Sequence, residues 1–171
     1  IFVFQHSGLF PWKTVWENAA LGVRHADGDL GDVIQEAIDL VELTGFEHHY
    51  PHQLSGGMQR RAELARALVV EPDILFMDEP FAGLDFLTRL KLREELINMH
   101  EFNRHTMLFV THDIDEALVM GDRVVLLSER PATIRLSEAI AVPHPRDFSS
   151  SPELADLRRR LYRMLDVHYA L

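Results

Sequence analysis

Acidic and imidazole side chains follow two short apolar runs of the sequence, and their types suit phosphoryl chemistry. Asp78 and Glu79 come after the run DILFM, and His112, with Thr111 and Asp113 beside it, comes after the run TMLFV. If both runs are parallel strands, their carboxyl ends meet at one edge of the sheet, where functional groups gather. One carboxylate suits Mg²⁺, a second can activate water, and a histidine can contact a terminal phosphate. The alternative is structural, because acidic residues after a strand are also common at loop starts and helix caps.

The stretch LSGGMQRR, residues 54–61, is a second candidate phosphate site. Ser55 can act as an N-cap, while Gly56 and Gly57 let the backbone approach an anion at the positive end of the helix dipole. A plain capped helix explains Ser55 equally well. It does not explain two successive glycines, each of which costs up to about 1 kcal/mol inside a helix. The turn therefore predicts phosphate contact through backbone amides.

The segment GLFPWKT, residues 8–14, resembles a phosphate-binding loop in Lys13 and Thr14 but lacks the glycine that precedes the lysine. Trp12 stands where that glycine is required, and Pro11 removes a backbone amide that a phosphate cradle would use. We therefore reject a phosphate loop here. We interpret Phe10 and Trp12 as exposed aromatic residues of a protein contact, with packing in the core as the alternative.

Apolar periodicity predicts the elements that must position these residues. The expected order is a helix with an apolar stripe from Val33 to Val41 that ends by Gly45, a helix from Ser55 to about Val70, a strand at 73–77, a helix at 86–102, a strand at 106–110, a helix at 114–120 and a strand at 123–127. The continuous apolar runs are typical of strands buried on both faces. Alternation of strands and helices predicts an α/β fold with one parallel sheet, in which 123–127 is a third strand.

The C-terminal part of the sequence has three expected segments. Residues 134–142 alternate as strands at a sheet edge do, and VPHPRDFSSSP is interpreted as a linker because of its Pro and Ser content. The last segment predicts a helix with leucines on one face, at Leu154, Leu157, Leu161 and Leu165. Arginines flank this face, at Arg158, Arg159, Arg160 and Arg163. We expect a tail helix docked by its leucines, and contact with lipid or a partner is the alternative.

Composition limits the classes of function. The 171 residues carry a net charge of -10, which argues against a nucleic-acid-binding surface, and no apolar run approaches the roughly 20 residues needed to span a bilayer. The absence of cysteine excludes disulfides and thiolate metal sites and suits a reducing cytoplasm. The histidines of HHYPH, residues 48–52, form a cluster in the sequence, but we do not interpret them as a metal site. The chain opens with Ile1 inside an apparent strand, so we expect the natural N-terminus to be missing.

Four motifs, taken in order, resemble those of an ABC transporter ATPase. Gln5 after a strand resembles the Q-loop, LSGGMQRRAELARAL the signature, ILFMDEPFAGLD the Walker B motif with the D-loop, and VTHDIDEA the switch histidine. The resemblance extends from residue 1 to about residue 165. QHSGLFPWKTVWENAALGV, SERPATI and the PHPRD segment with its tail helix further resemble the ATP-binding subunits of nitrate, sulfonate and taurine importers.

This resemblance implies the fold of a partial P-loop NTPase, a RecA-like α/β parallel-sheet core with an inserted ABC helical subdomain. It implies one ABC ATPase domain, with a core strand and Q-loop at 1–7, the helical subdomain at 8–57, the signature helix, Walker B motif, D-loop and switch histidine at 58–142, and a linker with the tail helix at 143–171. The implied cofactors are ATP and Mg²⁺.

The resemblance also implies roles for single residues. Asp78 would hold Mg²⁺ through water, Glu79 would polarise the attacking water, His112 would contact the γ-phosphate, Gln5 would sense metal and water, and Asp85 would reach toward a second subunit. In this family two domains pair head to tail, so Ser55, Gly56 and Gly57 would bind the nucleotide held by the partner.

The implied partners are a second copy of the subunit, transmembrane permease subunits and, indirectly, a solute-binding protein, with no nucleic acid. The implied location is the cytoplasmic face of the plasma membrane, as a peripheral subunit. The alternatives are a non-transport ABC ATPase that acts on nucleic acid or ribosomes, and a catalytically inactive fragment.

The sequence also departs from the family pattern. The signature usually has Arg or Lys before Gln, whereas Met58, Gln59 and Arg60 shift the glutamine by one place. Glu63 is acidic where a small apolar residue is usual, and Gly83 takes a place often filled by alanine. The largest departure is that no lysine-bearing P-loop precedes Gln5, so we expect an N-terminal portion with the Walker A motif to be absent.

Overall fold

The computed structural model describes residues 1–4, 8–23, 30–70, 72–103 and 106–165, with the backbone alone at 102 and 103. The chain divides into two compact units, Ile1–Val110 and Thr111–Leu171. The division into subdomains expected from the family resemblance stays a prediction.

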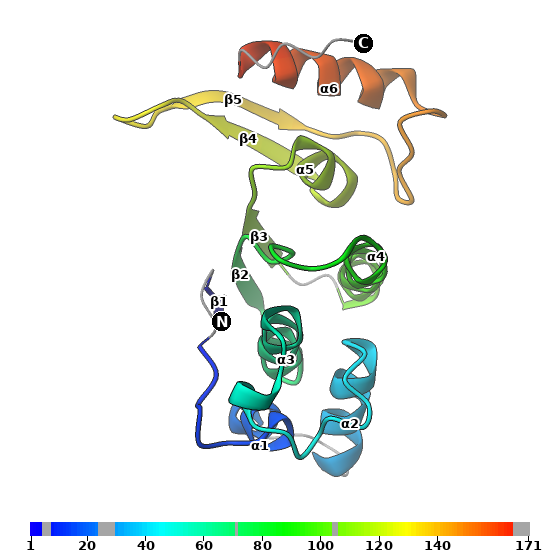
Figure 1. Cartoon of the computed structure of the whole chain (residues 1–171). Helices are drawn as coiled ribbons and strands as arrows, with labels where there is room; N and C mark the ends of the chain where they lie inside the picture. The colour runs from blue at the N-terminus through cyan, green and yellow to red at the C-terminus, as the bar shows by residue number, and fades with distance from the viewer. Residues whose placement is uncertain (5–7, 24–29, 71, 104–105, 166–171) are drawn as a thin grey trace. The chain divides into compact units, whose positions relative to one another are not determined.

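A parallel sheet forms the core of the first unit, in the order β1-β2-β3 (Figure 1). Its strands are β1 at Phe2–Val3, β2 at Ile74–Asp78 and β3 at Thr106–Val110. Both strand pairs are parallel, with Phe2 opposite Phe76 and Met77 opposite Phe109. The expected parallel α/β core is therefore present. Strand β2 extends one residue beyond the expected run and includes Asp78.

The expectation that these strands are buried on both faces is wrong. Leu75 and Met77 are buried, but Ile74 is 47% exposed, Leu108 53% and Val110 55%. Successive side chains of a strand point to opposite faces of a sheet, so exposure of alternate residues means that one face is covered in the described structure and the other is accessible. A continuous apolar run shows only that both faces of the strand are apolar. Whether a face is buried depends on which elements pack against it.

Helices α1, α2 and α3 pack against one another in the first unit (Figure 1). In chain order the helical elements of this unit are α1 at Val15–Ala19, the 3₁₀ turn η1 at Ala20–Gly22, α2 at Leu30–Leu40, the 3₁₀ turn η2 at Pro51–Gln53, α3 at Gly56–Leu68 and α4 at Phe86–Asn103. The buried residues of α2 are Ile34, Ala37 and Ile38. They recur at helical spacing, as the apolar stripe predicted.

Helix α2 ends before the glycine that was expected to end it. Glu42 takes the left-handed backbone conformation with φ 56°. The amide of Leu43 donates to the Ile38 carbonyl at 3.0 Å, and the amide of Glu42 donates to the Asp39 carbonyl at 2.9 Å. These two bonds are those of a Schellman motif, which satisfies the last carbonyls of a helix. Gly45, with φ 87°, belongs to the turn that follows.

One buried side chain, Asn18, holds the aromatic loop before α1 in place. Its Oδ1 accepts from the Phe10 amide at 2.8 Å. Its Nδ2 donates to the carbonyls of Phe10, Lys13 and Thr14 at 3.2, 3.0 and 2.9 Å. Trp12, which lies within this loop, is 69% exposed. The exposed position agrees with the interpretation of Trp12 as a surface residue, and its contact with a protein partner stays a prediction.

The second unit is built on an antiparallel hairpin rather than on another parallel strand. Strands β4 at Arg123–Leu127 and β5 at Ile134–Ala139 pair in antiparallel register. The expectation that 123–127 joins the parallel sheet as a third strand is therefore wrong. Only residues 128–133 connect β4 to β5, and a connection this short suits a hairpin, since a parallel pair needs a crossover.

Two helices pack on this hairpin, α5 at Ile114–Met120 and α6 at Pro152–Met164 (Figure 1). The buried core of the unit is formed by Ile114, Leu118, Val124, Ile140, Leu154, Leu157 and Leu161. The docked tail helix is thus confirmed for three of its four expected leucines. Leu165 follows the last residue of α6 and is exposed.

Arginines of α6 and of the segment before it make contacts inside the second unit. Arg158 forms a bidentate pair with Asp115, with both N to O distances at 2.7 Å, and this hydrogen bonding raises the pKa of Arg158. Arg160 pairs with Glu138. The expected linker is anchored as well, because buried Arg146 donates to the Leu118 carbonyl at 3.0 Å. With Arg159, which pairs with Asp156 at 3.3 Å, three of the tail arginines are therefore partnered by acidic residues of the same unit.

The substitution Asn18→Asp tests the hold on the aromatic loop. Aspartate keeps the size and the accepting oxygen of asparagine but loses the donated bonds to three carbonyls. We expect the free energy of unfolding to fall by about 1–3 kcal/mol, the usual cost of unsatisfied buried polar groups. Urea unfolding followed by tryptophan fluorescence measures it, since both tryptophans of the chain, Trp12 and Trp16, lie shortly before this residue in the sequence. Asn98→Asp, at an exposed position of α4 outside the loop, is the control, and equal losses in the two variants would contradict the assignment.

Candidate functional site

Two carboxylates lie at the carboxyl end of β2, where a parallel sheet places its functional groups. Asp78 is the last residue of the strand and pairs in register with Val110 of β3. Glu79 follows it, and its amide donates to the Val110 carbonyl at 2.9 Å. Both acidic residues are half-buried. The acidic pair therefore lies at the edge of the sheet that the preceding apolar run predicts for it.

Glu79 has a backbone conformation that the sequence did not indicate. Its φ is 49°, in the left-handed region that residues with a side chain rarely adopt. Such conformations cost of order 1–3 kcal/mol and persist where the surrounding structure fixes them. The chain reverses sharply here, and the Ala82 amide donates to the Glu79 carbonyl at 3.1 Å. The strained turn therefore sets the direction in which the Glu79 side chain leaves the strand.

The loop between β2 and α4 contains Gly83 and Asp85, which were singled out from the sequence. Gly83 has φ 76°, so a glycine suits this position better than the alanine usual in the family. Asp85 caps α4, because its Oδ1 accepts from the Thr88 amide at 3.1 Å. The hydrogen bonds with Thr88 hold the pKa of the Asp85 carboxyl below its ordinary value. The contact of Asp85 with a second subunit stays a prediction.

The signature turn begins helix α3, as expected. Ser55 is its N-cap, with the hydroxyl accepting from the Met58 amide at 3.2 Å. Ser55 and Gly56 are exposed, and a Cβ added at Gly56 would meet nothing within 4 Å. A Cβ added at Gly57 would lie 3.4 Å from the Gly83 carbonyl oxygen. The turn thus lies beside the loop that follows the acidic pair, within the first unit.

His112 belongs to the second unit and precedes helix α5. It is exposed, and its neighbour Asp113 caps the helix by accepting from the amides of Asp115 and Glu116 at 2.8 and 3.2 Å. The Thr111 hydroxyl donates to Glu116 at 2.8 Å. Asp113 therefore has a structural role at this helix, and the contact of His112 with a γ-phosphate stays a prediction.

Gln5, expected to sense metal and water, lies outside the described residues. The residues on either side of 5–7, Phe4 and Gly8, are described, and both contact helix α3 through side chains of that helix. Thr14 of the rejected phosphate loop has a structural role, because it forms a capping box with Glu17 at the start of α1.

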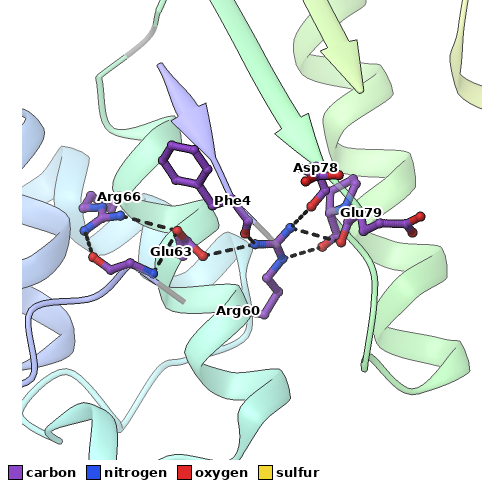
Figure 2. A network of polar contacts seen from close by, with 8 residues as sticks. Phe4, Arg60, Glu63, Arg66, Asp78 and Glu79 are labelled. Carbon is purple, nitrogen blue, oxygen red and sulfur yellow. Dashed lines mark hydrogen bonds and ion pairs between the residues drawn. The ribbon is translucent and has the colours of Figure 1, made fainter. Parts of the chain in front are cut away.

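Sequence reasoning missed the part that Arg60 and Glu63 take in this site. Both were noted only as departures from the family pattern, yet Arg60 is 5% exposed and Glu63 is 1% exposed, and they form an ion pair at 3.1 Å. Arg60 donates to the carbonyls of Asp78 and Glu79 at 2.6 and 3.0 Å (Figure 2). The usable signal was their i, i+3 spacing on one helix, which predicts a side-chain pair.

Within the ranges that the structure describes, no helix is both long and apolar enough to cross a bilayer. The described residues also contain no group of three or more His, Asp or Glu side chains arranged to hold a metal ion. His48 and His52, which are exposed, are among the residues to which this applies.

Comparison with known proteins finds relatives that all belong to one family. The profile of the ABC transporter family matches residues 1–82. The chain is 41% identical over 165 residues to an aliphatic sulfonates import ATP-binding protein of Bacillus cereus, covering 96% of this chain and 65% of the relative. It is 43% identical over 178 residues to the nitrate import ATP-binding protein NrtD of Synechococcus elongatus, covering 98% and 65%. The chain thus spans about two thirds of the length of these curated relatives.

A further relative and a solved structure support the same family. The aliphatic sulfonates import ATP-binding protein SsuB of Bacillus subtilis is 39% identical over 173 residues, covering 99% of this chain and 68% of the relative. A solved dimeric structure of the ATP-binding cassette MJ0796, in a post-hydrolysis state bound to ADP and Pi, matches with a TM-score of 0.73 and 34% identity. The match covers 83% of this chain and 63% of the solved one. With the parallel sheet, the acidic pair and the capped signature turn, these matches show that the chain belongs to the ABC transporter family.

Proposed function

We propose that the complete protein binds and hydrolyses ATP to drive an importer that takes up a small anion such as nitrate, a sulfonate or taurine. The observation that carries this proposal is the acidic pair at the end of β2. Its second member, Glu79, has a left-handed backbone conformation with φ 49°. The names of the relatives, which refer to sulfonate and nitrate import, support the class of solute. The net charge of -10 supports transport over an action on nucleic acid.

In this mechanism the two carboxylates have different roles. Asp78 would hold Mg²⁺ through water, and Glu79 would orient and polarise the water that attacks the terminal phosphate. An ion held there would supply positive charge near the phosphate oxygens, where negative charge develops during the reaction. The donor set suits this ion, because Mg²⁺ in such sites is held by one or two carboxylates together with waters and substrate phosphates rather than by an all-protein cage.

The remaining residues act around the same nucleotide. His112 contacts the γ-phosphate, Gln5 senses metal and water, and Asp85 reaches toward a second copy of the subunit. Ser55, Gly56 and Gly57 bind the nucleotide held by that second copy. The exposed, capped turn at the start of α3 supports this role, since backbone amides at a helix N-terminus favour an anion.

The proposed assembly contains two ATP-binding subunits arranged head to tail, with transmembrane permease subunits and, indirectly, a solute-binding protein. The ATP-binding subunits lie at the cytoplasmic face of the plasma membrane. The dimeric state of the solved ATP-binding cassette supports the pairing of two subunits.

The substitution Glu79→Gln tests the hydrolytic role in the complete protein. Loss of the general base should lower the rate of ATP hydrolysis by about 10²- to 10⁴-fold, while ATP binding persists. Phosphate release and nucleotide titration measure the two properties. Glu94→Gln, an exposed glutamate of α4, is the matched control and should keep the wild-type rate. Retention of full hydrolysis by Glu79→Gln would refute the role of Glu79.

The substitution Ser55→Ala separates phosphate contact from helix capping. Ser55 caps α3 by accepting from Met58, and Ser151 caps α6 by accepting from the Leu154 amide at 3.3 Å. Loss of either cap should lower the free energy of unfolding by about 1 kcal/mol. Hydrolysis by the dimer should fall at least tenfold in Ser55→Ala alone, while ATP binding to the monomer is unchanged. Equal hydrolysis rates in Ser55→Ala and Ser151→Ala would show that Ser55 acts only as a helix cap.

A further inference from the structure

Three charged side chains form a row on helix α3, facing the carboxyl end of β2 and the residues that flank 5–7 (Figure 2). Arg60, Glu63 and Arg66 follow one another at i, i+3 spacing, so they lie on one face of the helix. Glu63 contacts both arginines, Arg60 at 3.1 Å and Arg66 at 3.6 Å. A buried carboxylate between two guanidinium groups keeps its charge balanced.

The Arg60 guanidinium finds an acceptor for each of its N–H groups. Nε donates to the Pro80 carbonyl at 3.2 Å, Nη1 to the Phe4 carbonyl and to Glu63 at 3.1 Å, and Nη2 to the carbonyls of Asp78 at 2.6 Å and Glu79 at 3.0 Å. Most of these acceptors are backbone oxygens. Arg60 therefore binds the backbone of the acidic pair and of Pro80 after it, and none of these bonds goes to a carboxylate of that pair.

The bonds from Nη2 explain how Glu79 is held in its turn. In a regular strand, successive carbonyls point in opposite directions, so one donor group does not reach two neighbouring carbonyls. The φ of 49° at Glu79 breaks this alternation and brings the carbonyls of Asp78 and Glu79 to the same guanidinium nitrogen. The two charge-assisted bonds stabilise a conformation that is otherwise unfavourable.

The other two charged residues hold Gly8, on the far side of 5–7. Glu63 accepts from the Gly8 amide at 3.2 Å, and Arg66 donates to the Gly8 carbonyl at 2.8 Å. A Cβ at this position would lie 3.2 Å from the Glu63 carboxylate, so the backbone approaches closely here. Phe4 and Gly8 are thus fixed to the same face of α3 that fixes Glu79.

We propose that Arg60 is a positioning residue for ATP hydrolysis, which sets the direction of the Glu79 carboxylate by binding the carbonyls on both sides of the Glu79 Cα. The role rests on the proposed function, because it acts through Glu79. Since Arg60 belongs to the helix that starts with the signature turn, it also ties that turn and the acidic pair into one rigid group. Glu63 balances the charge of Arg60 and is not itself required for this direction.

The substitution Arg60→Gln in the complete protein tests the role. We expect kcat for ATP hydrolysis to fall by about 10- to 100-fold, as for a displaced catalytic group, with KM for ATP within about twofold of wild type. Arg60→Lys should recover little, because an ammonium lacks the planar fork of donors. In a Glu79→Gln background, Arg60→Gln should cause no further loss, whereas additive losses would show that Arg60 does not act through Glu79.

Two further variants separate positioning from folding. Arg61→Gln is the matched control, because Arg61 is the next residue of α3 and also donates to two carbonyls, those of Val41 and Glu42. It should keep kcat within twofold of wild type. The double variant Arg60→Gln with Glu63→Gln also neutralises the buried carboxylate that has lost the nearer of its two arginines, so its thermal midpoint should exceed that of Arg60→Gln while kcat stays low.

The outcomes distinguish this role from the proposed function. Recovery of kcat in the double variant to within twofold of wild type would make Arg60 a charge partner alone and overturn the proposal. If Glu79→Gln abolishes hydrolysis and Arg60→Gln does not lower it, the positioning role is likewise overturned and the proposed function stands. A complete wild-type protein without ATP hydrolysis would overturn both.

Discussion

A guanidinium taken out of water needs an acceptor for every N–H it carries, and Arg60 finds most of its acceptors on the backbone around the acidic pair. This requirement connects segments that are distant in the sequence: the end of β1, the first turns of α3 and the loop after β2. The arrangement also explains why two departures from the family signature occur together. Glu63 is acidic because it lies against Arg60, and a small apolar residue would leave that arginine without its counter-charge.

Sequence patterns located the site but not the contacts that shape it. Asp78 and Glu79 were placed correctly because a short apolar run ends just before them, and the start of α3 was marked by a capping serine. The left-handed turn at Glu79 was not foreseeable, because local preference disfavours it and distant side chains impose it. The bonds from Arg60 leave no sequence pattern either, since their acceptors are carbonyls that every residue has.

The sheet predictions failed where they depended on tertiary partners. Apolar runs identified β2 and β3, but the same residues cannot tell whether a second layer covers the sheet, and Leu108 proved exposed. Strand β4 was found at its expected residues yet paired with β5, because strand composition carries no information about the neighbour.

Several candidate functional residues also cap helices, among them Ser55, Asp85 and Asp113. A loss of activity on replacing such a residue therefore combines two effects, local folding and chemistry.

The bonds of Asn18 have a consequence for association at the aromatic loop. Because its amide group ties the backbone from Phe10 to Thr14 on several sides, the loop that carries Trp12 is ordered in the unbound protein. A partner that packs against the exposed indole binds a loop whose backbone is already fixed in one conformation. Little conformational entropy then remains to oppose binding, so a small contact area at this position can yield a useful affinity.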